Sequence, residues 1–317
     1  MVPAKNRHSG GDRGGDSACS IRPAGEGEFL PADAVFAGFE TYLRGRGLSP
    51  GSVEVYLGAA RRFARWWEET TGEAFDPAAV TVIDVADYRR HLLNRGRKAA
   101  TVNANVEALR AFFGWLKESG AVQGDPTEGV KKVPQERTPP RWLTRREVGA
   151  LARAAQRHGT ARDRALLALL LHAGLRVSEA VNLKVQDVVI RERSGNVAVR
   201  QGKGGKSREV PLNATARRVL AEYLEGVSGG WLFPGRDGGP MTPRAAQKRL
   251  RELGRLAGVD VTPHRLRHTF CKMLVDTGES LDRVALLAGH ASLDTTAVYT
   301  KPGRADLERA VERLTWE

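Results

Sequence analysis

Residues 262–270, TPHRLRHTF, are the stretch of sequence on which the interpretation of this chain depends. The threonine–proline pair that opens it predicts a helix start, because threonine caps helices well and proline is favoured at their first position. A helix over residues 263–276 carries His264, Arg267 and His268 on one face, since positions i, i+3 and i+4 lie side by side. The stretch therefore predicts a helical face with two histidines and an arginine.

Two plainer interpretations of this face remain open. Histidines four residues apart can bind zinc, but the glutamate of the H-E-x-x-H motif is missing and the arginines between the histidines would repel a metal ion. A helix whose basic face is turned to solvent would give the same string of residues.

Downstream, the sequence predicts two more short helices and a tyrosine. Gly289 is typical of the left-handed residue that ends a helix, here one over residues 281–288, and His290 follows it. Residues 294–296, DTT, open a further short helix on which Tyr299 is expected to lie. A single tyrosine is most often a packed core residue with a phenol pKa of about 10. Nearby arginines would lower that pKa and favour the phenolate, the nucleophilic form.

Upstream, an arginine lies between two predicted helices. An apolar helix ends at Gly174, and Arg176 follows just before a second helix that Ser178 and Glu179 open. An arginine fixed at such a junction can give two parallel hydrogen bonds to a phosphate, which a lysine cannot do. The alternative is a cation that only binds the carbonyl groups at the end of the first helix.

Residues 202–207, GKGGKS, end like a nucleotide-binding phosphate loop but do not fit that motif. Arg200 stands where its first glycine is needed, and a strand rather than a helix is expected next. We interpret the segment as the turn of a β-hairpin, from which Lys203 is a candidate proton donor. Lys206 and a plain hairpin tip are the alternatives.

The positive charge of the chain is concentrated in its C-terminal part. The 317 residues carry a net charge of +13; Lys and Arg outnumber Asp and Glu by 34 to 20 in residues 131–317, against 12 to 14 in residues 28–130 and 4 to 3 in residues 1–27. Such a field suits a polyanion such as DNA or RNA, although a generally basic protein would also show it. Candidate phosphate contacts flank the hairpin or lie on a basic helix; they are Arg208, Arg244 and Lys248.

Composition excludes several other classes of protein. The two cysteines, Cys19 and Cys271, do not make a disulfide framework, so a reducing cytoplasm is the expected compartment. The longest apolar stretch, residues 165–173, is too short to cross a bilayer and is broken by His172. No apolar segment follows the basic residues near the N-terminus, so a secretory signal is not expected.

The pattern of elements predicts a mainly α-helical fold with a small antiparallel β-sheet. Residues 1–27 are expected to be disordered. Residues 28–130 predict a helical bundle, with helices over residues 34–44, 50–67, 82–93 and 101–116. The proline-bearing residues 131–140 predict a linker. For residues 141–317 the prediction is strands over residues 188–190, 196–200 and 208–212, and helices over residues 145–157, 161–173, 214–225, 243–257, 263–276, 281–288 and 305–314.

Taken together, four stretches resemble the tyrosine recombinases, most closely the bacterial Xer branch and the phage or transposon integrases. They are GLRVSE (residues 174–179), the Lys203 hairpin that ends in VPL (residues 210–212), HRLRHTF (residues 264–270) and LAGHASLDTTAVYT (residues 287–300). The resemblance covers residues 30–317 and implies a SAM-like core-binding domain followed by a recombinase catalytic domain. Ala288, where the family usually has a bulky residue, and Lys301, where Xer proteins usually have histidine, depart from the pattern.

The resemblance implies a site-specific DNA recombinase that works through a 3′-phosphotyrosine intermediate, without metal or other cofactor. It assigns roles to six residues: Tyr299 as nucleophile, Arg176 and Arg267 as phosphate clamp, His264 and His290 as hydrogen-bond donors that help to manage the nucleophile's proton, and Lys203 as the acid that protonates the 5′-oxygen. A type IB-like topoisomerase and a DNA-binding module without catalysis are the alternatives.

The same resemblance implies the partners. They are a double-stranded recombination site, a tetrameric synapse in which the C-terminal helix is exchanged between subunits, and a second recombinase or an accessory factor. The protein would act in the cytoplasm at the nucleoid, with no membrane involved.

Overall fold

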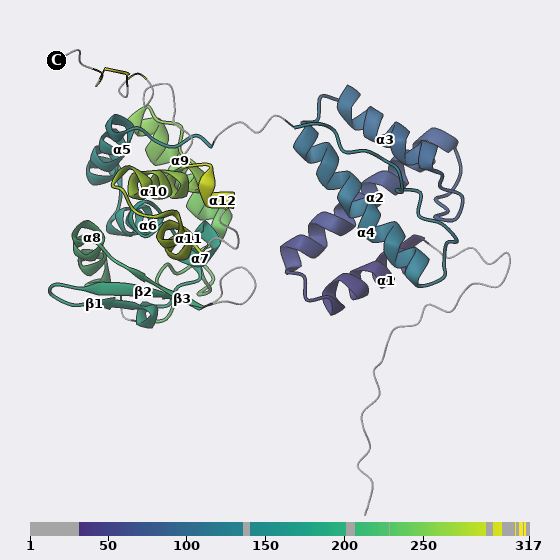
Figure 1. The fold of residues 1–317 in the computed structure, drawn as a ribbon. Coiled ribbons are helices and arrows are strands. Elements are labelled where there is room, and N and C mark those ends of the chain that lie inside the picture. The colour runs from purple at the N-terminus through teal and green to yellow at the C-terminus, as the bar shows by residue number, and fades with distance from the viewer. Residues whose placement is uncertain are drawn as a thin grey trace, which may run out of the picture. The chain divides into compact units, whose positions relative to one another are not determined.

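The computed structural model describes residues 32–135, 140–200, 207–227, 229–289 and 294–299, and the single residues 308, 311, 312 and 314. The chain forms two compact units that divide between residues 137 and 138 (Figure 1). Helices dominate both units, and the second also holds a three-stranded antiparallel sheet. The predicted fold class is therefore confirmed.

The first unit is a bundle of four helices, as predicted. They are α1 (Ala32–Gly45), α2 (Pro50–Thr71), α3 (Val82–Asn94) and α4 (Ala99–Glu118). Ser49 caps α2 as its sequence suggested, because the Ser49 side chain accepts a hydrogen bond from the backbone N–H of Ser52. The core is aromatic: the ring of Phe112 meets that of Phe39 edge-on, with 5.1 Å between the ring centroids. Aromatic rings bury large areas, which allows so small a bundle its own core.

The segment after α4 is fastened to the bundle by side chains that bind its backbone. The buried amide of Asn103 donates from Nδ2 to the carbonyl of Val133 at 2.9 Å and accepts from the N–H of Val133 at 2.8 Å. Arg89 donates to the carbonyl of Lys131, and Arg110 to that of Val130, both at 2.5 Å. Residues 130–133 therefore belong to the bundle.

The second unit contains the three predicted strands in the order β1-β2-β3, each antiparallel to its neighbour. Val197, in the middle strand, pairs with Val188 on one side and Val210 on the other, and it is fully buried. The tip of the β2–β3 hairpin, residues 201–206, lies outside the described residues. The strands are β1 (Val188–Ile190), β2 (Gly195–Val199) and β3 (Arg208–Pro211).

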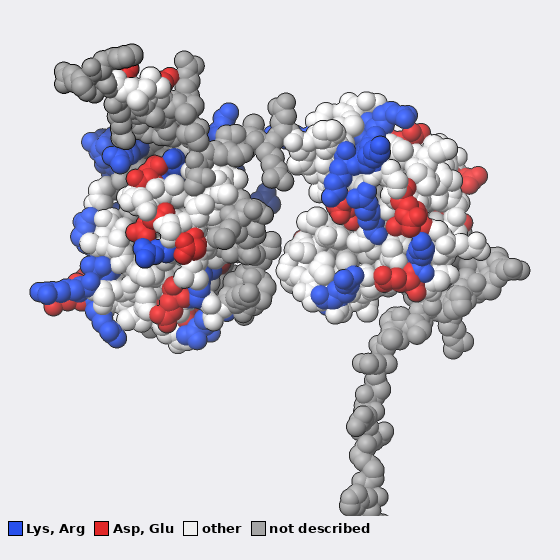
Figure 2. All heavy atoms as spheres, viewed as in Figure 1, with Lys and Arg blue, Asp and Glu red and all other residues white. Residues whose placement is uncertain are grey.

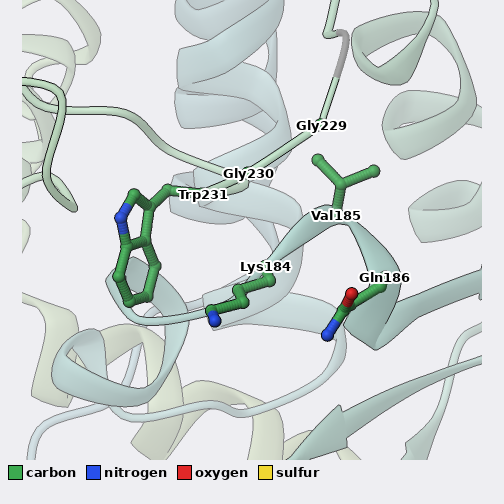
Figure 3. A pocket seen from close by; sticks show the side chains of 6 residues that line it. All are labelled: Lys184, Val185, Gln186, Gly229, Gly230 and Trp231. Atoms are coloured by element: carbon green, nitrogen blue, oxygen red, sulfur yellow. The ribbon is translucent and has the colours of Figure 1, made fainter.

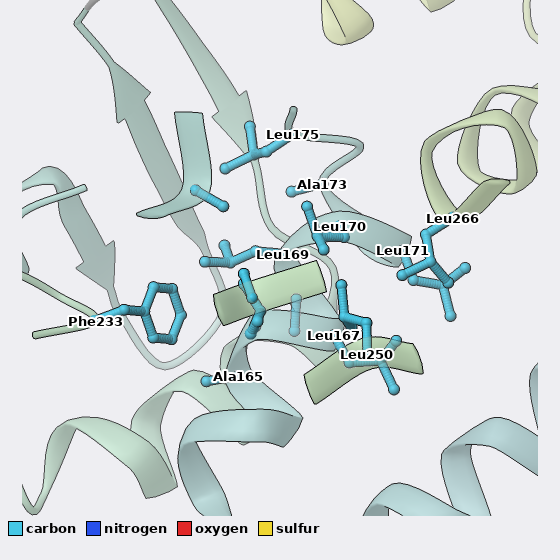
Figure 4. Close-up of a cluster of buried hydrophobic side chains, with 14 of the residues drawn as sticks. Ala165, Leu167, Leu169, Leu170, Leu171, Ala173, Leu175, Phe233, Leu250 and Leu266 are labelled. Carbon is cyan, nitrogen blue, oxygen red and sulfur yellow. The ribbon is translucent and has the colours of Figure 1, made fainter. Parts of the chain in front are cut away.

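Other helices of this unit pack around α6, and most of its side chains are buried (Figure 4). The division into an apolar and a polar face that is typical of a surface helix is missing from α6, because neighbouring helices pack around it. Of the predicted helices, only the one over residues 305–314 falls mostly outside the described residues. The helices are α5 (Arg145–His158), α6 (Ala161–His172), α7 (Val177–Val181), η1 (Val185–Asp187), α8 (Ala214–Leu224), α9 (Pro243–Ala257), α10 (Pro263–Asp276), α11 (Leu281–Ala288) and α12 (Asp294–Ala297).

Gly174, which separates α6 from α7, is a position that only glycine fits. Its φ is +62°, and a Cβ atom added there would lie 2.1 Å from Cδ1 of Phe270. Gly174→Ala is therefore expected to destabilise the second unit by about 3 kcal/mol or more, from left-handed strain together with overpacking. Urea unfolding followed by circular dichroism measures the loss.

Gly258→Ala is the matched control, because Gly258 has a similar φ of +66° but nothing within 4 Å of the added Cβ. It is expected to cost about 1–2 kcal/mol, the strain alone. Equal losses for the two variants would show that the contact with Phe270 carries no cost.

Candidate active site

Three arginines from separate elements converge on the C-terminal end of α11. Arg176 precedes α7, Arg208 begins β3, and Arg267 lies in α10. Each donates a hydrogen bond to a different backbone carbonyl there: those of Gly289 at 2.8 Å, of Leu287 at 3.3 Å, and of Ala288, respectively. The carbonyl groups at the end of a helix carry its negative dipole end, which favours this gathering of cations. The structure thus brings Arg176 and Arg267 together.

A buried carboxylate, that of Glu179, holds two of these arginines in place. Arg176 donates to Oε1 of Glu179 at 2.7 Å, and Arg208 donates to both carboxylate oxygens, at 3.0 and 2.9 Å. Burial by itself would raise the pKa of Glu179, but hydrogen bonds from Arg208 and Arg176 keep that pKa below its usual value. Glu179 is therefore ionised, and one negative charge stands against three guanidinium groups.

Arg267 is the most deeply buried arginine of the cluster. Only 5% of it is exposed, and it also donates to the carbonyl of Gly174 at 2.5 Å. Burial and the nearby charge of Arg176 lower the pKa of Arg267 to about 10, so it stays protonated at neutral pH. A guanidinium has five N–H groups, so a side chain that binds two carbonyl oxygens can still donate to a phosphate.

Tyr299 lies just after α12 and not on it, which corrects the sequence-based expectation. Its backbone N–H donates to the carbonyl of Thr296 in a turn, and its side chain is 1% exposed. The expected lowering of its pKa is also wrong for this structure. Burial raises the pKa of Tyr299 well above its usual value, Cys271 adds to the rise, and Arg267 opposes it only in part. In this arrangement the phenol keeps its proton.

The histidine beside the tyrosine is His268, which the sequence analysis placed on the helical face without a catalytic role. Its Nδ1 lies 2.6 Å from the hydroxyl oxygen of Tyr299. His264, the histidine that was assigned a catalytic role, is exposed on the first turn of α10, and its ring centroid is 6.3 Å from that of His268. The i, i+4 spacing of the two histidines indicated that their rings lie on one face of α10, but it gave no signal for the contact of His268 with Tyr299.

Two of the predicted catalytic residues, Lys203 and His290, lie outside the described residues. The residue before the histidine, Gly289, has a φ of +63° and ends α11, as predicted. A Cβ atom on Gly289 would lie 2.7 Å from the guanidinium of Arg208, so the arginine cluster leaves no room for a side chain there.

The three candidate phosphate contacts fall into two groups. Arg244 and Lys248 are exposed one turn apart on α9. Arg208 instead belongs to the arginine cluster, with its guanidinium on Glu179 and its side chain 12% exposed. Helix α9 is bound to α6, because Arg249 of α9 donates to both carboxylate oxygens of Asp163 in α6, at 3.1 and 2.6 Å. On the face that Figure 2 shows, basic and acidic side chains are interspersed on both units.

A separate pocket of about 460 Å³ lies beside η1 (Figure 3). The ammonium of Lys184 sits over the ring of Trp231, 5.3 Å from its centroid. No predicted site residue that the structure describes lines this pocket; its lining is Lys184, Val185, Gln186, Gly229, Gly230 and Trp231. Within the described ranges, no group of three or more His, Cys, Asp or Glu side chains is placed to hold a metal ion. No helix among these residues is long and apolar enough to span a membrane.

Two family models match the chain, one for each unit. The model described as the phage integrase family matches residues 141–305, and that of the phage integrase N-terminal SAM-like domain matches residues 35–120. The first match covers more than half of the chain and includes the whole arginine cluster.

Named relatives and solved structures agree with these matches. The chain is 34% identical over 280 residues to a tyrosine recombinase XerA from Thermococcus kodakarensis, covering 87% of this chain and 93% of the relative. It is 33% identical over 264 residues to a tyrosine recombinase XerC from Xylella fastidiosa, with coverage of 80% and 87%.

Among solved structures, the fold is similar to XerH site-specific recombinase bound to palindromic difH in a post-cleavage complex. The TM-score is 0.70 at 22% identity, with coverage of 88% of this chain and 84% of that one. It is also similar to a lambda integrase dimer bound to a COC′ core site, with a TM-score of 0.69 at 18% identity and coverage of 87% and 97%.

Proposed function

The chain belongs to the phage integrase family, as a tyrosine recombinase, and from this premise we propose that Tyr299 is the nucleophile of its strand-cleavage reaction. The protein is a site-specific DNA recombinase, an enzyme that cleaves and rejoins DNA strands through a 3′-phosphotyrosine intermediate. Its Xer-like relatives support this assignment over a type IB-like topoisomerase.

One observation carries the proposal for the site: the convergence of Arg176 and Arg267 on the end of α11, with Tyr299 packed against the same helices. Both guanidinium groups are fixed by backbone carbonyls, so their positions are set before substrate arrives. Fixed donors stabilise charge that develops on the non-bridging oxygens of the phosphate without a reorganisation cost. This is the task of a phosphate clamp.

In the cleavage step, the phenol oxygen of Tyr299 forms a bond to phosphorus while the bond from phosphorus to the 5′-oxygen breaks. The phenol loses its proton, and the 5′-oxygen leaves with the electron pair and takes a proton from Lys203. His264 and His290 donate hydrogen bonds to the phosphate oxygens, and one of these two histidines takes up the proton that the phenol loses. Rejoining is the reverse reaction with a 5′-hydroxyl from the partner strand. Because the phosphotyrosine bond conserves the energy of the broken phosphodiester bond, the reaction needs no ATP.

We further propose that Glu179 fixes the clamp and that Arg208 acts within it. The bidentate pair between Arg208 and the buried Glu179 supports this role over the surface phosphate contact first expected. Arg244 and Lys248, exposed on a helix that is tied to the core through Arg249, are the better candidates for contacts with the DNA backbone.

The partners follow from the reaction. Exchange of strands between two duplexes requires recombinase subunits on each, and we propose a tetrameric synapse with exchange of the C-terminal segment between subunits. A second recombinase or an accessory factor, and action at the nucleoid, complete the proposal. The lambda integrase that this fold resembles was solved as a dimer on its core site, which supports assembly on DNA.

The function is tested by recovering the site that the protein cleaves. The protein is incubated with a pool of nicked duplexes that contain a random segment, the DNA that stays attached in detergent is isolated, and it is sequenced. A recombinase is expected to enrich one sequence with inverted half-sites. Relaxation of supercoiled plasmid with no sequence enriched would favour the topoisomerase.

Lys203 is expected to be needed only for protonation of the 5′-oxygen. Lys203→Ala should slow cleavage of normal DNA by about a hundredfold or more, the range for loss of a general acid. When sulfur replaces the bridging 5′-oxygen, the sulfur leaves without a proton. The defect of Lys203→Ala should therefore largely vanish on this substrate. Single-turnover adduct formation on both substrates measures this, with Lys206→Ala as the control. Equal defects of Lys203→Ala on both substrates would refute the assignment.

A further inference from the structure

Polar groups of α10 lie beside the hydroxyl group of Tyr299. Nδ1 of His268 lies 2.6 Å from the phenol oxygen, and a hydrogen bond joins the same hydroxyl to Cys271. The phenol oxygen can donate to Nδ1 or accept from it, according to which ring nitrogen of His268 carries the proton. Burial, together with the charges of His264 and Arg267, lowers the pKa of His268, which keeps its ring neutral.

This arrangement buries the side chain of Tyr299. Tyr299 is 1% exposed, and it packs in an apolar cluster with Phe270, Cys271, Val284 and Ala288. A phosphodiester cannot enter such a cluster, because its charge would lose its hydration. The tyrosine must therefore come out before it attacks, and its hydrogen bonds to His268 and Cys271 must break.

We propose that His268 is a positioning residue that holds Tyr299 in this buried place until DNA is bound. The inference rests on the proposed function, in which Tyr299 is the nucleophile. His268 follows Arg267 directly in α10, so the residue that holds the tyrosine and an arginine of the phosphate clamp share one helical turn. Phosphate binding and tyrosine release thus act on the same part of the helix.

The test measures how readily Tyr299 is nitrated by tetranitromethane in the free, full-length protein, with the modified residue identified by mass spectrometry. His268→Ala and His268→Phe remove the ring nitrogen that bonds to Tyr299, and the first needs no additional room. His268→Asn restores a hydrogen-bonding group, because its side-chain amide takes the place of Nδ1 and can donate or accept. A hydrogen bond of ordinary net strength shifts the balance between held and released tyrosine by roughly fivefold.

We expect nitration of Tyr299 to rise about fivefold in His268→Ala and His268→Phe and to return to the wild-type rate in His268→Asn. Tyr223 is the internal control, since it is buried and its hydroxyl donates to the carbonyl of Leu232 at 2.7 Å. Its nitration should not change in any variant. Nitration of Tyr299 that is the same in all four proteins, or that rises only in parallel with Tyr223, would overturn the proposal.

Adduct formation separates this inference from the proposed function. If adducts require Tyr299 while nitration does not depend on residue 268, the holding role is wrong and the function stands. If adducts form without Tyr299, the function itself fails, whatever the nitration shows. A loss of adduct formation common to Ala, Phe and Asn at position 268 would assign His268 to the proton transfer and also overturn the holding role.

Discussion

Replacement of Tyr299 by phenylalanine is expected to abolish the covalent adduct between protein and DNA. The change removes only the oxygen that forms the bond to phosphorus, and a phenyl ring fills the apolar cluster as the phenol does. Binding to the recovered site should stay within about threefold of wild type, because the charged contacts with DNA are untouched. Denaturing gels of a nicked substrate, on which religation is prevented, measure the adduct, and gel-shift titrations measure binding.

Tyr223→Phe is the matched control for this variant. Tyr223 is also a buried tyrosine with a hydrogen-bonded hydroxyl, but it packs on Phe233, outside the arginine cluster. It should form adducts at the wild-type rate. Adducts that persist in Tyr299→Phe at more than a trace would exclude Tyr299 as the nucleophile.

Loss of Arg267 is expected to have the second-largest effect. Arg267→Ala should slow cleavage by roughly a hundredfold or more in single-turnover reactions at saturating DNA, since one fixed charge-stabilising donor is removed. Arg267→Lys should recover little of this, because a point charge lacks the planar fork of the guanidinium. At Arg176 we likewise expect a large loss with alanine and little recovery with lysine. Arg176 is more exposed than Arg267 and also forms an ion pair with Glu179.

Arg265→Ala provides the control on the same helix. Arg265 is also largely buried, but it binds Asp260 rather than the end of α11. It should cleave within a few fold of wild type once DNA is saturating. Circular dichroism confirms that each variant is folded, and a lysine variant at position 267 that cleaves at the wild-type rate would show that charge alone is enough.

Local signals explain why most elements could be predicted. Ser49 before Pro50, Thr144 with Glu147, and Thr262 before Pro263 fix helix starts through bonds within a few residues, and the structure has these caps. The strand that contains Val197 could be predicted for a related reason, because its partners Val188 and Val210 are close in the sequence. The boundaries of these elements agree with the predictions to within a few residues.

The site was predicted by residue type but not by surroundings, because the surroundings depend on distant parts of the chain. Glu179 was interpreted only as part of a helix start, whereas in the structure it is buried and bound by Arg208, which comes from β3 later in the chain. The lowered pKa expected for Tyr299 assumed that the arginines dominate, whereas burial outweighs them. Burial of a single side chain is a tertiary property that no short stretch of sequence specifies.

The bonds between Asn103 and Val133 decide how the bundle should be prepared as a separate fragment. A fragment that stops at residue 130 would leave the Asn103 amide, which is 8% exposed, without the backbone groups it binds. An unpaired buried amide costs about 1–3 kcal/mol, a large share of what a bundle of this size has to spare. A fragment that continues to Gln135 keeps both bonds. The end of this folding unit is therefore set by hydrogen bonds from its last helix and not by the prolines that follow.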